Sequence, residues 1–167
     1  MRTMQIKVGK LKTLRIRQFQ ISHCPGKHAM LSVEGYINDE ETDEVKRMSV
    51  SDTTVQIQLL TEHESKQWYG YVYDIEIQHM PHETYIRAKL ISQSVTMDKE
   101  KKTRSFQTEG TTIGQIIEYV CKDYDVKVNL QGTDQAMDKM IVQYEETDWE
   151  FIKRLASGLN EQVIVRP

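Results

Sequence analysis

Histidine, cysteine and carboxylate side chains are the groups that could hold a metal or transfer a proton in this sequence. His23, Cys24 and His28 lie close together, and imidazole nitrogens with a thiolate are ligands that suit zinc. Their spacing matches no zinc knuckle, and no second ligand pair follows. We therefore expect the segment from Cys24 to His28, which contains Pro25 and Gly26, to be a turn that binds no metal.

A second histidine pair, His79 and His82, flanks Pro81. Histidine titrates near neutral pH and could move a proton, but the proline between the two favours a surface turn over residues 79–84. Cys121 falls on the apolar side of a predicted helix, so we interpret it as a small buried hydrophobe rather than a nucleophile.

Carboxylates crowd one further place, at Glu145, Glu146, Asp148 and Glu150. Paired carboxylates can act as acid and base, but these stand at the start of a predicted helix, where the helix dipole favours negative charge without any substrate. The sequence contains no nucleophile elbow, phosphate-binding loop, dinucleotide fingerprint or HExxH motif. We therefore expect no enzyme and no cofactor.

The helix that follows these carboxylates is the clearest element in the sequence. Thr147 and Glu150 form a capping-box pattern, and large apolar side chains then recur at three- to four-residue spacing through residue 159. Gly158 is expected to take the left-handed conformation beyond the helix end. Short apolar segments at 140–144 and 162–165 predict a strand on either side.

Length and composition limit the classes of protein. With 167 residues, 38% of them hydrophobic, the chain can form one domain or two small ones with a real core. Its 22 basic and 25 acidic residues give a net charge of -3, which argues against nucleic-acid binding through a general positive field. The N-terminus has no apolar signal region, no window approaches a membrane span, and the two cysteines form no disulfide pattern.

Residues 1–97 predict antiparallel β structure. Strands are expected at 14–21, 29–37, 53–60, 66–78 and 85–97, with a β-bulge in the first where its alternation slips by one residue. The charged segment 38–47 is interpreted as an exposed loop. Strands joined by short turns indicate a barrel or a strongly curled sheet, because closure removes exposed edges.

The strand at 66–78 carries apolar residues on both faces. Tyr69, Tyr71 and Tyr73 alternate with Trp68, and the residues between the rings are not basic, which argues against stacking on single-stranded nucleic acid. A strand with two apolar faces suits a position between the core and a neighbouring subunit. We therefore take Trp68, Tyr69, Tyr71 and Tyr73 as a candidate subunit interface.

The period of the hydrophobic pattern changes after Asp98. A polar run covers 98–108, and Thr112 with Gln115 then repeats the capping-box pattern before a one-faced helix. A strand is expected at 126–130 and a loop at 131–138. We predict an α+β protein with an N-terminal antiparallel β-barrel-like domain at 1–100, followed by a small domain at 101–167 with the order helix, strand, strand, helix, strand.

Four stretches of this sequence resemble the baseplate hub proteins of contractile injection machines. These proteins include the phage late control protein D family, the hubs of tailocins and the VgrG spike proteins of type VI secretion. The stretches are YGYVYDI (69–75), KKTRSFQ (101–107), TIGQII (112–117) and YEETDWEFIKRLA (144–156). The motif positions taken from them as structural are Arg104, Ser105, Phe106, Gln107, Glu146, Thr147, Trp149, Glu150, Phe151 and Leu155.

The resemblance implies a structural part without catalysis. Hubs of this family form homotrimers that continue the tail tube and carry the spike, so tube and spike proteins are the expected partners, with no specific nucleic acid and no membrane anchor. The expected location is the virion tail or assembled particle, after synthesis in the bacterial cytoplasm. Family subunits usually carry two barrels, whereas this sequence has room for one barrel and a module.

Within the motifs, we expect Arg104 to pair with an acidic neighbour and Phe106 to be buried at the junction of the two domains. Two other interpretations remain open. The aromatic strand and the small α+β module would also suit a cell-wall or glycan-binding module of a tail-associated protein. A five-stranded oligonucleotide-binding barrel is the other, although the acidic balance counts against it.

Overall fold

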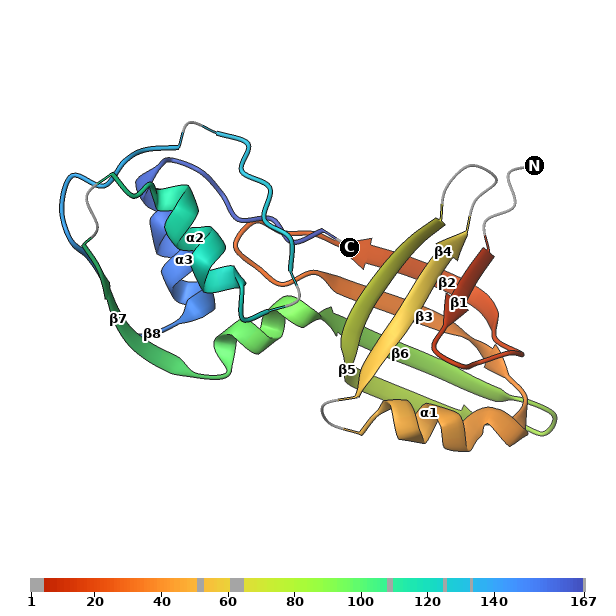
Figure 1. The fold of residues 1–167 in the computed structure, drawn as a ribbon. Coiled ribbons are helices and arrows are strands. Elements are labelled where there is room, and N and C mark those ends of the chain that lie inside the picture. Colours follow the sequence, from red (N-terminus) through yellow and green to blue (C-terminus); the bar gives the residue numbers. More distant parts are fainter. Residues whose placement is uncertain are drawn as a thin grey trace. The chain divides into compact units, whose positions relative to one another are not determined.

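The structure is a computed structural model, and it describes residues 5–50, 53–60, 65–107, 110–124, 126–132 and 134–166. The chain divides into two compact units (Figure 1). The first comprises Met1–Cys24, His28–Gln93 and Val165–Pro167, and the second comprises Pro25–Lys27 and Ser94–Ile164.

The first unit is a six-stranded antiparallel sheet that curls strongly (Figure 1). Its spatial order is β1 (Gln5–Val8), β4 (Thr54–Leu60), β5 (Ser65–His79), β6 (Thr84–Ser92), β3 (Met30–Ile37) and β2 (Arg15–Ser22). In the part of the chain that the structure describes, the end strands β1 and β2 do not pair with each other. The predicted barrel-like sheet is therefore a curled half-barrel, and its α+β class is confirmed.

The core of this unit lies on the concave side of the sheet. Leu31, Ile57 and Leu90 are almost fully buried there, each from a different strand. The predicted bulge in the first strand is confirmed as a shift of pairing register between Ile16 and Gln18, which keeps apolar side chains on the core side after the slip.

A short helix closes one end of this core and corrects the prediction of an exposed loop at 38–47. The segment forms a 3₁₀ turn, η1 (Asp39–Glu41), and the helix α1 (Thr42–Met48). Val45 and Met48 are buried and one helical turn apart. Two buried apolar residues are enough to pack this helix on the core, because the other side chains of so short a helix stay in water.

A bulge in β5 corrects the predicted faces of that strand. The pairing of β5 with β6 shifts by one residue between Val72 and Asp74, so side chains exchange faces there. Trp68 and Val72 face the core before the bulge, and Ile75 packs against the same core after it. The strand therefore keeps one face on the core throughout, and the second apolar face in its sequence pattern combines outward tyrosines such as Tyr69 before the bulge with core-facing isoleucines after it.

The second unit packs two helices on a two-stranded ribbon. Its elements are η2 (Gln93–Asp98), β7 (Lys101–Phe106), α2 (Ile113–Cys121), β8 (Ile141–Thr147) and α3 (Asp148–Gly158). β7 and β8 pair antiparallel. The predicted capping boxes of α2 and α3 are both confirmed, with each threonine side chain accepting from the third residue of its helix.

Five expectations for residues 85–167 were wrong. The polar run at 98–108 contains strand β7, and the segments 126–130 and 162–165 are not strands, so the module reads strand, helix, strand, helix. A strand needs a partner for its backbone groups, and alternation alone does not supply one. The fifth predicted strand ends at Ser92, and Gln93–Asp98 forms the 3₁₀ helix instead. At the end of α3, Gly158 is still helical and Asn160 takes the left-handed conformation with φ 59°.

Candidate functional site

The carboxylate of Asp148 is the centre of a buried polar cluster in the second unit. Asp148 is the first residue of α3 and is 0% exposed. Its Oδ2 accepts hydrogen bonds from Lys102 Nζ at 2.8 Å and Tyr124 Oη at 2.7 Å. Its Oδ1 accepts from Gln143 Nε2 at 2.8 Å and from the Arg104 guanidinium. Four donors, two from β7, one from β8 and one from the segment after α2, therefore converge on one buried anion.

Alternation along the ribbon brings these donors to one face. Lys102 and Arg104 stand two residues apart on β7, so both point toward the helices. Gln143 is the cross-strand partner of Arg104 on β8. A bulge between these pairs leaves Glu145 with φ 47°, and the chain then turns into α3, which places Asp148 beneath both strands.

Hydrogen bonding decides the protonation state of this cluster. Burial alone would raise the pKa of Asp148, but the bonds from Lys102, Gln143, Tyr124 and Arg104 outweigh it and hold that pKa below its usual value. The bond to Asp148 raises the pKa of Lys102. Asp148 is therefore ionised and fully engaged near neutral pH, which leaves it unsuited to accept a proton from a substrate.

Cys121 lies near this cluster on α2 and is buried. Burial, with smaller contributions from Asp148 and Glu118, raises the pKa of its thiol to about 11. A thiol with so high a pKa is a poor nucleophile at neutral pH. The interpretation of Cys121 as a buried hydrophobe therefore agrees with its surroundings.

The aromatic motif residues form the apolar part of the same unit. The ring of Phe106 stacks on Phe151 of α3, with centroids 5.7 Å apart, and meets the edge of Tyr119 of α2 at 5.9 Å. These contacts lie inside the second unit, where Trp149 and Leu155 are also buried.

The remaining motif residues cap α3, form an ion pair or lie on the surface. Thr147 and Glu150 form the cap of α3, and Thr147 Oγ1 also donates to Asp98 Oδ1 at 2.7 Å. Glu146, whose side chain is 18% exposed, forms an ion pair with Arg154. Ser105 and Gln107 are exposed.

The structure brings together residues that lie in separate stretches of the sequence. Arg104 does pair with an acidic neighbour, as expected, and that neighbour is Asp148. Lys102, Tyr124 and Gln143 were not predicted from the sequence as partners of this carboxylate. The two-residue spacing of Lys102 and Arg104 could have indicated that both side chains share one face of a strand. It lies in the polar run at 98–108, where the boundary between the two predicted domains falls.

The tyrosines of the candidate interface lie on the convex face of the first unit. Tyr69 is 41% and Tyr73 68% exposed, whereas Trp68 is only 2% exposed and packs in the core. Tyr69 Oη accepts from Gln56 Nε2 and donates to Gln67 Oε1, both at 3.0 Å. Tyr69 and Tyr73 are thus available to a partner, and Trp68 is not.

Cross-strand ion pairs cover the centre of this convex face. Arg87 on β6 bonds Glu34 on β3 at 2.9 Å and Glu76 on β5 at 3.1 Å, and Lys89 bonds Asp74 at 3.3 Å. Directly opposed charges of this kind stabilise a sheet. The centre of the convex face is therefore polar, with two cationic and three anionic side chains joined in ion pairs.

The histidine and cysteine segment behaves as a turn. A ring nitrogen of His23 lies 2.9 Å from the carbonyl oxygen of Val165, and Cys24 is exposed and unbridged. Among the described residues, no three His, Cys, Asp or Glu side chains gather as metal ligands would. Every helix in that part of the chain is also too short or too polar to cross a membrane.

Comparison with known proteins relates this chain to tail proteins. Residues 31–158 match the family model described as phage tail baseplate hub. The 43 kDa tail protein of prophage MuSo2 from Shewanella oneidensis has a TM-score of 0.67 at 17% identity, over 99% of this chain and 56% of its own. The E. coli c3393 protein is described as a type VI secretion component similar in structure to T4 bacteriophage tail proteins gp27 and gp5. It has a TM-score of 0.65 at 14% identity, over 96% of this chain and 48% of its own.

These likenesses to solved structures concern the fold, and this chain spans about half the length of each. A comparison with curated protein sequences gives no match.

Proposed function

The chain belongs to the phage tail baseplate hub family, and from that premise we propose that it joins the tail tube to the spike without catalysing a reaction. Its role as a structural tail component follows from the family. The observation that carries the proposal is the family match itself, which runs from β3 through α3 and so includes elements of both units.

The polar convex sheet face supports a position in a ring. A ring that continues a tube needs a hydrophilic wall along which tape measure, DNA or effector can pass. Ion pairs such as Glu34 with Arg87 make that face polar without a large net charge, so a passing polymer would meet few uncompensated charges. We propose a homotrimer in the assembled particle.

Tyr69, Tyr71 and Tyr73 are the residues proposed to contact a neighbouring subunit. Tyrosine supplies a large apolar ring and a polar hydroxyl, a combination enriched at interfaces. Trp68 supports this surface from the core side of the same strand. The motif residues from Arg104 to Gln107 and from Glu146 to Leu155 are proposed to hold the second unit in shape.

The absence of catalysis is supported by the state of the ionisable groups. The buried carboxylate of Asp148 is occupied by four donors, and the buried thiol of Cys121 has a pKa of about 11. Neither group is prepared to act as a base or a nucleophile at neutral pH.

Negative-stain electron microscopy of the native gene product tests the proposal. We expect rings with a central hole, bound at the end of tail tubes in purified particles. Monomers that never enter tails would overturn it. Retention on purified peptidoglycan would instead favour the glycan-binding alternative, for which the exposed Tyr69 and Tyr73 with their amide neighbours would serve as the platform.

A further inference from the structure

One stretch of the sequence carries positive charge without any negative charge. Glu34 is the first acidic residue, and seven of the 22 basic residues precede it. From Glu34 onward the chain carries the other 15 basic residues and all 25 acidic ones. A purely cationic stretch therefore stands beside a remainder with a clear excess of negative charge. Six of its seven basic residues lie among the described residues, namely Lys7, Lys10, Lys12, Arg15, Arg17 and Lys27.

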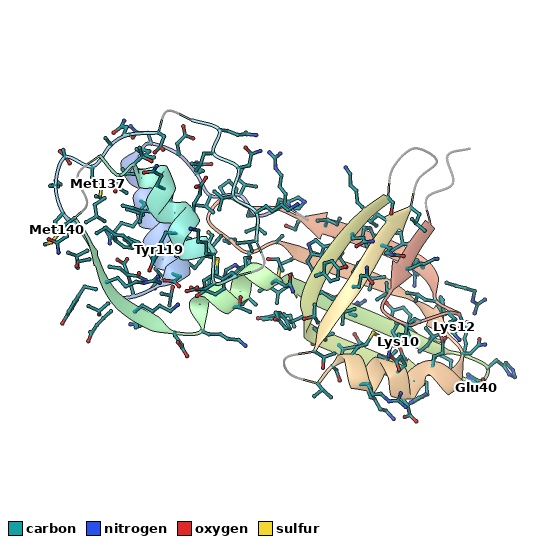
Figure 2. The ribbon with its side chains drawn as sticks, viewed as in Figure 1. Lys10, Lys12, Glu40, Tyr119, Met137 and Met140 are labelled. Atoms are coloured by element: carbon teal, nitrogen blue, oxygen red, sulfur yellow. The ribbon has the colours of Figure 1, made fainter. Side chains whose placement is uncertain are left out.

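The fold places most of these cations on the two end strands of the sheet and on the segment that joins them. Lys7 lies on β1 and Arg17 on β2, which stand at opposite ends of the strand order. Residues 9–14, which we call the strap, connect β1 to β2 and carry Lys10 and Lys12. Figure 2 labels both lysines. The strap therefore presents two positive charges between the edges of the first unit.

Contacts on both sides hold the strap in one conformation. Leu11 is buried in the core of the first unit. The carboxylate of Glu41 in η1 accepts hydrogen bonds from the backbone nitrogens of Lys12 at 2.7 Å and Thr13 at 3.1 Å. Lys10 and Lys12 are both exposed, and within the described ranges neither side chain forms an ion pair. Two uncompensated cations are thus held on an ordered surface.

Protection of the sheet edges explains only part of this charge. Lysine and arginine on an edge strand hinder pairing with other chains, which accounts for Lys7 and Arg17. Lys10 and Lys12 belong to neither strand, so edge protection does not require them. The strap lysines therefore point to a bound partner that carries negative charge.

We propose that the strap binds carboxylates on a second copy of this chain. The inference rests on the proposed homotrimer. A ring of identical copies needs two different, complementary surfaces on each chain. A cationic strap on a chain with 25 acidic residues supplies such a pair, whereas contact between two straps would bring like charges together.

The surroundings of the strap argue against a nucleic acid as the occupant. Single-stranded nucleic acid is bound where exposed aromatic rings are interleaved with cations. Phe19 is the only aromatic residue at 5–22, and it packs against the core. Tight duplex binding uses about 6–10 phosphate contacts, more than the two strap lysines supply. Protein carboxylates therefore suit this surface better.

Zero-length crosslinking of the native gene product tests the inference. A carbodiimide joins a lysine amine to a carboxylate that already touches it. We expect a species of twice the chain mass whose linked peptides join Lys10 or Lys12 to a carboxylate, and we expect Lys10→Gln, Lys12→Gln to lose that link. Strap crosslinks found only at single-chain mass, or none from the strap at all, would overturn the inference.

Charge reversal gives a second readout by sedimentation velocity. Lys10→Glu, Lys12→Glu should weaken self-association at least about tenfold at 0.1 M NaCl. Wild type should weaken at 1 M NaCl, where the screening length falls from about 10 Å to about 3 Å. The matched control is Lys127→Glu, Lys139→Glu, which changes the net charge equally at exposed lysines of the second unit and should stay within about twofold of wild type.

All four substituted side chains are exposed, so equal melting curves by circular dichroism should verify that both variants fold. Equal self-association of the two variants would contradict the proposal and leave the proposed function intact. A wild-type chain that stays monomeric would also overturn the inference. One that in addition never enters tails would overturn the proposed function as well.

Discussion

Replacing Asp148 by asparagine removes the negative charge on which four donors converge, at almost unchanged side-chain volume. Removing one partner of a buried ion pair costs about 3–5 kcal/mol. The side chains of Lys102 and Arg104 remain 28% and 21% exposed, so water can solvate part of the charge left behind. We therefore expect the lower end of that range, about 3 kcal/mol of unfolding free energy.

The two tryptophans allow each unit to be followed separately. Trp68 is buried in the first unit and Trp149 in the second, so 5-fluorotryptophan gives one ¹⁹F resonance for each. In a urea titration, Asp148→Asn should lower the midpoint reported by Trp149 and leave that reported by Trp68 in place. The matched control is Glu145→Gln, an exposed carboxylate three residues earlier, on β8.

The pH dependence of stability provides an independent check on the sign of the contribution from Asp148. The folded pKa of Asp148 is lowered, so its contribution to stability is present above the unfolded value of about 4 and is lost as pH falls through the folded pKa. The stability difference between wild type and Asp148→Asn should therefore shrink below about pH 4. A loss under about 1 kcal/mol at neutral pH, or an equal loss for Glu145→Gln, would refute the reasoning.

Three further predictions concern packing and reactivity. Phe106→Ala should destabilise the second unit by about 2–4 kcal/mol, measured by urea unfolding, because it removes a half-buried ring from two aromatic contacts; an unchanged midpoint would contradict this. Gly114→Ala should cost about 1–3 kcal/mol because its Cβ would lie 2.4 Å from a leucine methyl, whereas Gly158→Ala, with nothing within 4 Å, should be neutral or stabilising in the same assay. With Ellman's reagent at neutral pH, exposed Cys24 should react rapidly and Cys121 only after unfolding; two fast thiols would be inconsistent with the buried position.

Local signals predicted the elements that depend on neighbouring residues. The caps of α2 and α3 follow from a threonine and an acidic or amide residue three positions later, and these interactions stay within one turn. The slip in β2 was also visible, because its alternation changes face on both sides of the bulge. Membership of the hub family followed from short motifs whose residues lie close in sequence.

The bulge in β5 shows where prediction from the apolar alternation fails. In β5, tyrosines outside the core continue the apolar alternation past the slip, so the pattern suggested two apolar faces. Only the pairing with β6 shows that Ile75 shares the core face with Val72. Likewise, none of the strands that the structure describes pairs with the apolar alternation at 126–130, whereas the polar segment of β7 pairs with β8.

The sequence by itself determined the helix caps, the antiparallel first unit and the family, because each depends on residue type at short range. Tertiary structure alone decided that Lys102, Arg104, Tyr124 and Gln143 share one acceptor in Asp148. Those residues are separated by up to 46 positions in the chain. A hydrogen bond over such a separation leaves no local periodicity, since it forms only when packing closes the intervening loops.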